Sequence, residues 1–271
     1  MGFGLGIGIG INRGQRAGLS KTVASFLSGT NGAAWDWADS ATVFENDAGT
    51  DACEAGDVLA VTKASILGSV TPLNLTRAAA STGCPLWQST YAQFDGSNDY
   101  IDGDSNTRSI FQAAPAAFFG ARFSLNSLAA SRHLGGWTTA STAFYRFGII
   151  ITATGAINVV YRRLDADSQT SRFTAEGLIT TGTTYTLLSW LDYANGGAGA
   201  LKVVLDGVEV MSQTLTGTGN TENTQSARVR IGSALNGLAE FSDIDYDRLI
   251  VAPKLASASE RAAITDWLEW I

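Results

Sequence analysis

The chain has 271 residues, of which 45% are hydrophobic and 16% are charged, so it can form a sizeable core and is too apolar for wholesale disorder. Its formal net charge of −7 at pH 7 argues against nucleic acid as a partner, because an acidic surface repels a polyanion. With 30 glycines against 4 prolines, the composition favours many short turns between strands.

The N-terminus alternates glycine with a large apolar residue from Gly2 to Ile11. A period of two predicts a strand with one apolar face and one face of bare backbone. Two interpretations stay open, a core strand of the same domain or an arm that docks into a partner subunit, and we favour the arm because a glycine-rich strand is a poor core element. The predicted arm covers residues 1–30, with a connector at 12–34. Its assembly residues are Phe3, Leu5, Ile7, Ile9 and Ile11.

The same terminus lacks the features of a membrane or export signal. Arg13 and Arg16 follow the apolar stretch, whereas a secretory signal has its basic residues in front. No stretch has the length and apolarity of a membrane span. The sequence therefore predicts no membrane insertion.

Strand-like runs bounded by turn residues occupy most of the remaining chain. They lie at 42–45, 58–62, 116–125, 145–152, 156–164, 183–192, 201–205, 208–211, 227–232 and 246–252. Residues 91–102 have the pattern of a hairpin, in which two strands flank a tight turn at 95–99. The strongest hairpin signal is Asp206-Gly207 between two apolar runs. Only the tail has a helical pattern, where Ser257 and Glu260 form a capping box. The prediction is an all-β antiparallel β-sandwich over residues 31–271 with a short C-terminal helix.

Three motifs resemble laminin-G-like, concanavalin-A-like domains in the order in which that family carries them. Phe94-Asp-Gly-Ser-Asn-Asp-Tyr-Ile is similar to the family's Phe-Asp-Gly-x-x-Asp-Tyr signature, and Leu205-Asp-Gly-Val-Glu-Val to its central hairpin. Tyr246-Asp-Arg-Leu-Ile-Val-Ala followed by Leu255-Ala-Ser-Ala-Ser-Glu resembles the closing strand and helix. The resemblance covers about residues 91–271 and implies a concanavalin-A-like jelly roll.

Upstream, Trp35-Asp-Trp-Ala-Asp-Ser-Ala-Thr-Val-Phe is similar to the stretch that precedes such a domain in bacteriophage virion and tail-fibre proteins. The resemblance implies a phage structural protein located in the virion: a tail fibre, head fibre or decoration subunit. Its implied partners are other virion subunits, reached through the arm in a homo-oligomer with a trimer favoured, and cell-surface polysaccharide. The alternative function is a stand-alone carbohydrate-binding lectin module.

Aromatic side chains beside predicted loops are the candidates for binding a sugar ring. We expect Trp137, Tyr145 and Tyr161 at such positions, with Trp137 exposed after its two preceding glycines. Trp190 and Trp267 are expected in the core, since most aromatic residues of a sandwich are buried.

Acidic residues around one turn suggest a cation site. Asp95, Asp99 and Asp102 are the candidate ligands, because calcium takes six to eight oxygen ligands. The alternative is that Asp and Asn are simply good turn formers. No other cofactor is expected. Cys53 and Cys84 are able to pair in an oxidising compartment, but two cysteines do not define a disulfide scaffold.

The least favoured function is glycoside hydrolysis. Asp243, Asp245 and Asp247 alternate along one predicted strand and so share a face, and paired carboxylates are what that chemistry needs. Glucanases of the same fold use glutamates at the two ends of this motif, whereas both are aspartates here. His133 is the one histidine and has no catalytic context. We therefore predict a non-enzyme without catalytic residues.

Overall fold

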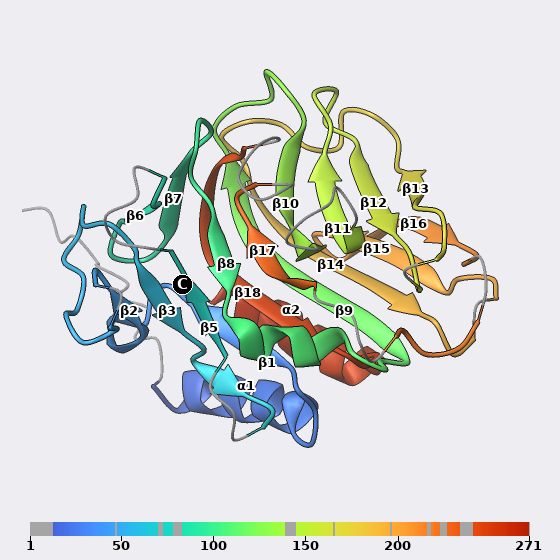
Figure 1. Ribbon diagram of the computed structural model, residues 1–271, viewed down its shortest axis with the longest axis horizontal. Helices are drawn as coiled ribbons and strands as arrows, with labels where there is room; N and C mark the ends of the chain where they lie inside the picture. The colour runs from blue at the N-terminus through green and yellow to red at the C-terminus, as the bar shows by residue number, and fades with distance from the viewer. Residues whose placement is uncertain are drawn as a thin grey trace, which may run out of the picture.

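The chain forms two stacked antiparallel sheets with two α-helices on one side, as the ribbon in Figure 1 shows. The computed structural model describes residues 13–46, 48–69, 73–77, 83–138, 145–164, 166–195, 197–215, 218–222, 227–233 and 241–270. The predicted all-β sandwich with a C-terminal helix is confirmed. The predicted assembly residues Phe3, Leu5, Ile7, Ile9 and Ile11 lie outside the described residues.

Sheet A runs in the order β16-β15-β14-β9-β18-β1-β4, with β7 paired to β18 and β6 paired to β7. Its strands are β1 (Ala33–Asp36), β4 (Ile66–Leu67), β6 (Leu86–Trp87), β7 (Ala92–Asp95), β9 (Ala116–Leu125), β14 (Thr184–Asp192), β15 (Leu201–Leu205), β16 (Val208–Gln213) and β18 (Asp243–Ala252).

Sheet B runs in the order β13-β12-β11-β10-β17-β8-β5-β3-β2. Its strands are β2 (Val43–Phe44), β3 (Val61–Lys63), β5 (Asn74–Thr76), β8 (Ile101–Gly103), β10 (Arg132–Thr138), β11 (Tyr145–Ile151), β12 (Ile157–Tyr161), β13 (Thr170–Phe173) and β17 (Arg228–Ile231). The helical elements are α1 (Arg13–Leu27), α2 (Ala258–Glu269) and the short 3₁₀ segments η1 (Ser40–Thr42) and η2 (Ser105–Phe111).

The main core lies between the two sheets because alternate residues of each strand point inward. In β18, Ile244 and Tyr246 are buried while their acidic neighbours are not. Aromatic side chains fill much of the space, with Phe94 packing edge-on against Tyr246 and Trp37 tilted beside it. Burial of each such side chain contributes about 1.5–3 kcal/mol relative to leaving it exposed.

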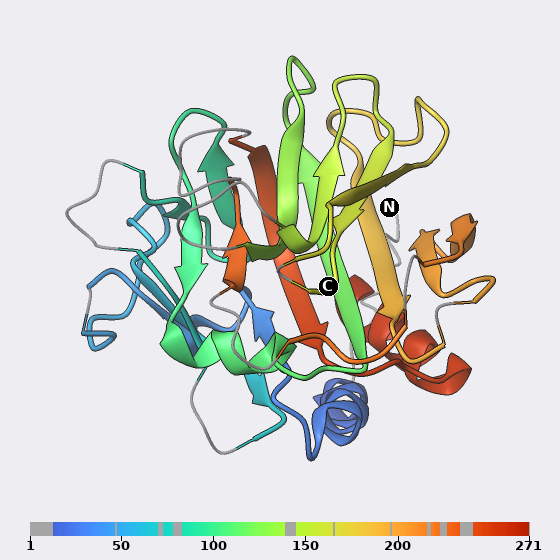
Figure 2. The same ribbon diagram turned by 45° about the vertical axis from the view of Figure 1, so that its right-hand side comes forward.

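A second apolar layer joins the outer face of sheet A to α1 and α2, which lie side by side in Figures 1 and 2. Phe26 of α1 packs edge-on against Phe118 of β9, with ring centroids 5.4 Å apart. Trp190 and Trp267 belong to this layer, so their predicted burial is confirmed. One sheet face is thereby covered by helices.

Local chemistry explains several predicted elements. Asp206 and Gly207 both have positive φ, which is the geometry of a tight hairpin turn, and they join β15 to β16 as predicted. Ser257 accepts a hydrogen bond from the backbone N–H of Glu260, whose side chain returns to the Ser257 N–H, so the predicted capping box is confirmed.

Two local expectations are corrected. The predicted connector contains α1, a 15-residue helix whose Val23, Phe26 and Leu27 are fully buried. The turn at 95–99 links a strand of sheet A to a strand of sheet B, so β7 and β8 are not hairpin partners. Neither helix of the described chain is long and apolar enough to cross a membrane.

Candidate functional site

The aromatic residues predicted to bind sugar are buried, which corrects that prediction. Trp137 is fully buried and stacks on Phe111, with ring centroids 4.9 Å apart. Tyr161 faces the same core because its register partner on β11 is the inward-pointing Phe147. The two glycines before Trp137 favour a loop by composition, whereas the structure places both in β10.

Tyr145 lies on the opposite, outer face of sheet B. Its ring packs across Gly148, where a Cβ atom would collide with it, and lies 5.3 Å from the ring of His133. Ile150 and Val160 complete this small cluster. At 5% exposure, Tyr145 offers little ring surface to a ligand.

Two of the predicted cation ligands organise the turn at residues 95–99 instead. The carboxylate of Asp95 accepts hydrogen bonds from the backbone N–H groups of Ser97 and Asn98, and that of Asp99 accepts one from the N–H of Asp95 at 2.9 Å. Burial raises the pKa of Asp99 from 3.8 to about 7. These contacts are those of turn formers, the alternative that the sequence left open.

The third predicted ligand, Asp102, forms a two-pronged ion pair with Arg230. Arg230 Nε contacts Oδ1, and Nη2 donates to Oδ2 at 2.7 Å. Within the described part of the chain, no group of three or more Asp, Glu, His or Cys side chains has the arrangement of a metal site. The structure thus does not bring Asp95, Asp99 and Asp102 together around a common cation.

Asp102 and Arg230 belong to a cluster on the outer face of sheet B, which we call the arginine patch: Arg77, Tyr100, Asp102, Arg228 and Arg230. The guanidinium of Arg77 lies 3.6 Å from the centroid of the Tyr100 ring, and that of Arg230 lies 5.1 Å from it. The sequence predicted none of this, although the alternation Arg228-Val-Arg230 already places two arginines on one strand face. Arg77 and Tyr100 reach the patch through β5 and β8, which are distant in sequence.

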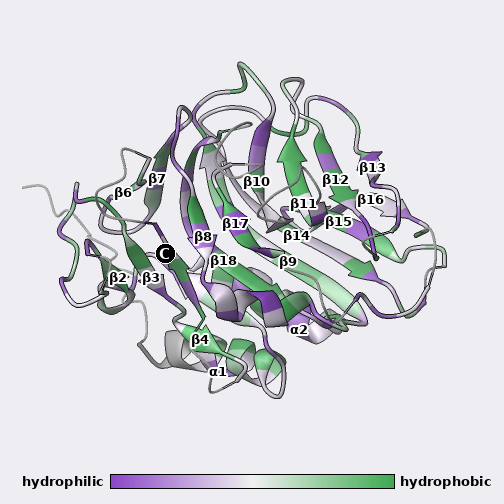
Figure 3. Cartoon of the chain, in the orientation of Figure 1, coloured by the Kyte–Doolittle hydropathy of each residue, from purple (hydrophilic) through white to green (hydrophobic). Residues whose placement is uncertain are grey.

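Polar side chains with unmet hydrogen-bonding capacity lie beside the arginine patch. His133 of β10 and Asn158 of β12 lie on either side of Ile150 of β11, and both pair with it in the register. Oδ1 of Asn158 has no hydrogen bond, and His133 interacts with the Arg230 backbone. Burial and the charge of Arg230 lower the pKa of His133 from 6.5 to about 3. Figure 3 shows hydrophilic segments on β10 and β17 in this region.

The predicted aspartate row is confirmed as a shared face. Asp243, Asp245 and Asp247 all point outward from β18, on the side of sheet A away from the main core. Asp245 accepts a hydrogen bond from Asn126 at 3.2 Å, and burial raises its pKa. Burial also raises the pKa of Asp247, against the opposing charge of Arg122.

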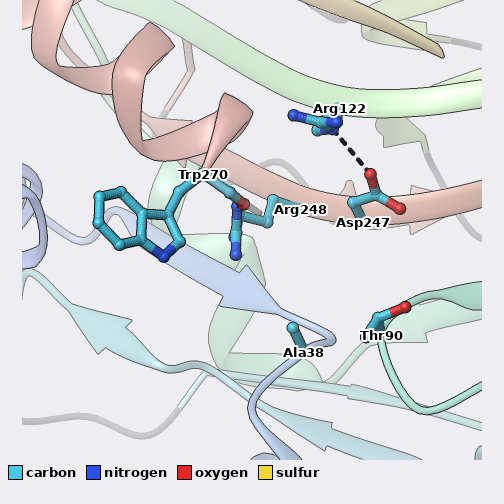
Figure 4. A pocket seen from close by; sticks show the side chains of 6 residues that line it. All are labelled: Ala38, Thr90, Arg122, Asp247, Arg248 and Trp270. Carbon is cyan, nitrogen blue, oxygen red and sulfur yellow. Dashed lines mark hydrogen bonds and ion pairs between the residues drawn. The ribbon is translucent and has the colours of Figure 1, made fainter. Parts of the chain in front are cut away.

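Asp247 also lines a pocket beside the end of α2, which we call the α2-end pocket. Its volume is about 160 Å³, and it is lined by Ala38, Thr90, Arg122, Asp247, Arg248 and Trp270 (Figure 4). In Figure 4, the Trp270 indole lies at one end, the Arg122–Asp247 pair at the other, and Arg248 between them. The Arg122 Nε to Asp247 Oδ2 distance is 2.8 Å.

The two cysteines are buried and do not form a disulfide with each other. Burial, together with the nearby Asp57 carboxylate, raises the pKa of the Cys53 thiol to about 12. A thiol of that kind is a poor nucleophile, because the thiolate is the reactive form.

Comparisons with known proteins give a fold but no family. No family model matches the sequence, and no curated protein matches it. Among solved structures, the chain is similar to the K499G mutant of the Streptococcus pneumoniae sialidase NanB, with 16% identity, a TM-score of 0.51, and coverage of 64% of this chain and 27% of the sialidase.

Two other similar structures have lower TM-scores. One is the CBM40 module of Ruminococcus gnavus IT-sialidase bound to α2,3-sialyllactose (16% identity, TM-score 0.47, 56% of this chain and 83% of that one). The other is the receptor-binding domain of botulinum neurotoxin mosaic serotype C/D (10% identity, TM-score 0.48, 66% and 42%). At these identities the likeness shows the fold alone, and nothing in the comparisons indicates a bacteriophage origin.

Proposed function

We propose that this protein is a carbohydrate-binding, lectin-like module that binds acidic glycans at the arginine patch. The observation that carries the proposal is the stack of Arg77 and Arg230 around Tyr100, with Arg228 on the same face of β17 as Arg230, on a chain whose net charge is −7. Asp102 forms an ion pair with Arg230, and the carboxylates of Asp99 and Asp104 lie near Arg77 and Arg228, so the guanidinium groups of the patch stand among acidic residues.

Guanidinium groups suit this task because they bind carboxylates through paired, charge-assisted hydrogen bonds. Arg228 is partly exposed, and its Nε has no hydrogen bond. The outer face of sheet A is partly covered by α1 and α2.

We also propose that binding occurs without bond cleavage. Asp245 and Asp247, the carboxylates with raised pKa on β18, are held by Asn126 and Arg122 and lie on the other sheet from the arginine patch. The corresponding assay is release of reducing ends from acidic oligosaccharides. Cleavage that disappears in Asp245→Asn and Asp247→Asn variants would contradict the non-enzymatic role and favour the hydrolase alternative.

The virion function stays a prediction. It is supported by the sequence resemblance around residues 35–44 and by the alternating segment at residues 2–11, which lies outside the described residues. A glycan-binding role is compatible with it, since a fibre subunit can carry a lectin domain. Virion location and partners await an assembly experiment with a chain lacking residues 1–12.

The test of glycan binding is a glycan array followed by calorimetric titration of the best acidic hit, with 3′-sialyllactose as the first defined probe. We expect Arg228→Ala and Arg77→Ala each to weaken binding by about tenfold, the loss of roughly one charge-assisted hydrogen bond. Arg172→Ala is the matched control, because Arg172 lies on the edge strand β13 and donates only to the neighbouring Ser171 carbonyl. Absence of any acidic glycan from the array hits, or equal losses in all three variants, would refute the proposal.

A further inference from the structure

The α2-end pocket is held rigidly by the contacts that fasten α2 to sheet A. Arg122 Nη1 donates to the Glu269 carbonyl at 2.7 Å, and Arg248 Nη1 donates to the Trp267 carbonyl at 3.1 Å. The Nε of Arg248 also lies 3.1 Å from a carboxylate oxygen of Asp36. Cationic side chains commonly satisfy the last carbonyls of a helix in this way. Both guanidinium groups are therefore fixed before any ligand arrives.

These contacts leave specific polar atoms without a partner. Nη2 of Arg122, Oδ1 of Asp247 and the hydroxyl of Thr90 have no hydrogen bond within the described part of the chain. Because Arg122 and Asp247 are paired, a donor and an acceptor sit next to each other at one end of the pocket (Figure 4). A fixed donor–acceptor pair matches two neighbouring hydroxyl groups, each of which can donate and accept.

The size and charge of the pocket limit the class of ligand that it can bind. About 160 Å³ has room for roughly five water molecules, which suits one sugar ring better than a longer oligosaccharide. Asp243 and Asp245 lie on the same outer face as Asp247, so this region disfavours an anion. The pocket thus differs in charge from the arginine patch on the other sheet.

We propose that the α2-end pocket binds a single neutral sugar ring, with Arg122 and Asp247 contacting adjacent hydroxyls and Thr90 supplying a third polar contact. The Trp270 indole forms the apolar end of the pocket, and aromatic rings pack favourably against the C–H faces of sugars. This site goes beyond the proposed function: it is a second site, on the opposite sheet, for a ligand of a different charge class.

The experiment follows the indole N–H signal of Trp270 by NMR while the intact protein is titrated with methyl α-glucopyranoside, methyl α-mannopyranoside and methyl α-galactopyranoside. The signal is assigned from its loss in a Trp270→Phe variant. We expect at least one glycoside to shift it with a dissociation constant in the millimolar range, as is usual for one small polar ligand. Thr90→Val should weaken that binding about fivefold, since it removes a hydrogen-bonding group and keeps the shape.

Thr214→Val is the matched control, because Thr214 is exposed and does not line the pocket. It should leave the dissociation constant unchanged, as should Arg228→Ala, which alters only the arginine patch. That second control separates this inference from the proposed function, since either site can fail without the other. No Trp270 shift with any of the three glycosides at about 50 mM, which fills most of a site whose dissociation constant is a few millimolar, would overturn the proposal. Equal affinities in the wild type and Thr90→Val would overturn it too.

Discussion

At the scale of single residues, Asp99 couples the stability of the sandwich to pH. Its pKa in the folded protein is about 7, against 3.8 for an unperturbed aspartate, because it is buried beside the turn that it closes. Between about pH 4 and pH 7, Asp99 is therefore protonated in the folded state and ionised in the unfolded state. The stability that the folded state gains from protonated Asp99 is fully present below about pH 4 and is lost as the pH rises through 7.

Replacement of Asp99 by Asn should remove that dependence. Asn can still accept the hydrogen bond from the Asp95 N–H, so the turn is expected to persist. Urea unfolding at several pH values between about 4 and 8 gives the unfolding free energy as a function of pH. The slope of that dependence for Asp99→Asn should differ from the wild-type slope by roughly one proton. The exposed Asp266→Asn serves as control. His133, whose pKa is lowered to about 3, contributes a slope of opposite sign to both proteins, so it cancels in the comparison. Parallel curves for wild type and Asp99→Asn would contradict the assignment.

Residue chemistry also explains which site predictions held. The aspartate row of β18 was predictable because alternation along one strand needs no knowledge of its neighbours. Trp137 was placed at the surface because its two preceding glycines are loop residues by composition. In the structure those glycines allow close packing instead, since a Cβ at Gly135 would meet the ring of Phe119 at 2.9 Å. The arginine patch depends on strand order, which a single sequence does not reveal.

At the scale of elements, the fit of α2 on sheet A depends on one missing side chain. A Cβ at Gly120 would lie 2.8 Å from Ile250 Cγ2 and 2.9 Å from Leu188 Cδ2, beneath Leu268 of α2. We expect Gly120→Ala to destabilise the protein by about 1–3 kcal/mol, the usual cost of overpacking a full core. Urea denaturation measures the change.

The control substitution makes the same chemical change in α1. A Cβ at Gly18 would meet no atom within 4 Å, and Gly18 has helical backbone, so Gly18→Ala should stabilise the protein by about 0.5–1 kcal/mol. Opposite signs for the two glycine substitutions are the expected result. A neutral Gly120→Ala would mean that α2 is loosely seated on the sheet.

At the scale of the whole molecule, strand content was predictable and strand order was not. The alternation of apolar residues, the Asp206-Gly207 hairpin and the capping box of α2 are local features, and all three are found. In contrast, β1 pairs with β18, so that Ala33 lies opposite Val251 near the other end of the chain. Pairings of that range depend on how the whole chain folds. Short strands such as β2 and β4 likewise owe their conformation to neighbours rather than to their own residues.

The same long-range packing sets where the folded unit begins. The sequence suggested an arm over residues 1–30, but Val23, Phe26 and Leu27 are buried against the outer face of sheet A. A chain lacking residues 1–12 should therefore unfold at the same urea concentration as the full chain. A chain lacking residues 1–31 should lose several kcal/mol of unfolding free energy, at roughly 1.5–3 kcal/mol for each large apolar side chain removed from the core.

Light scattering of the chain lacking residues 1–12 tests the predicted arm separately. A fall in oligomeric state with unchanged stability supports the arm, whereas an unchanged oligomeric state places assembly elsewhere on the sandwich. Equal stability of the full chain and the 1–31 truncation would show instead that α1 is an appendage, in spite of its buried face.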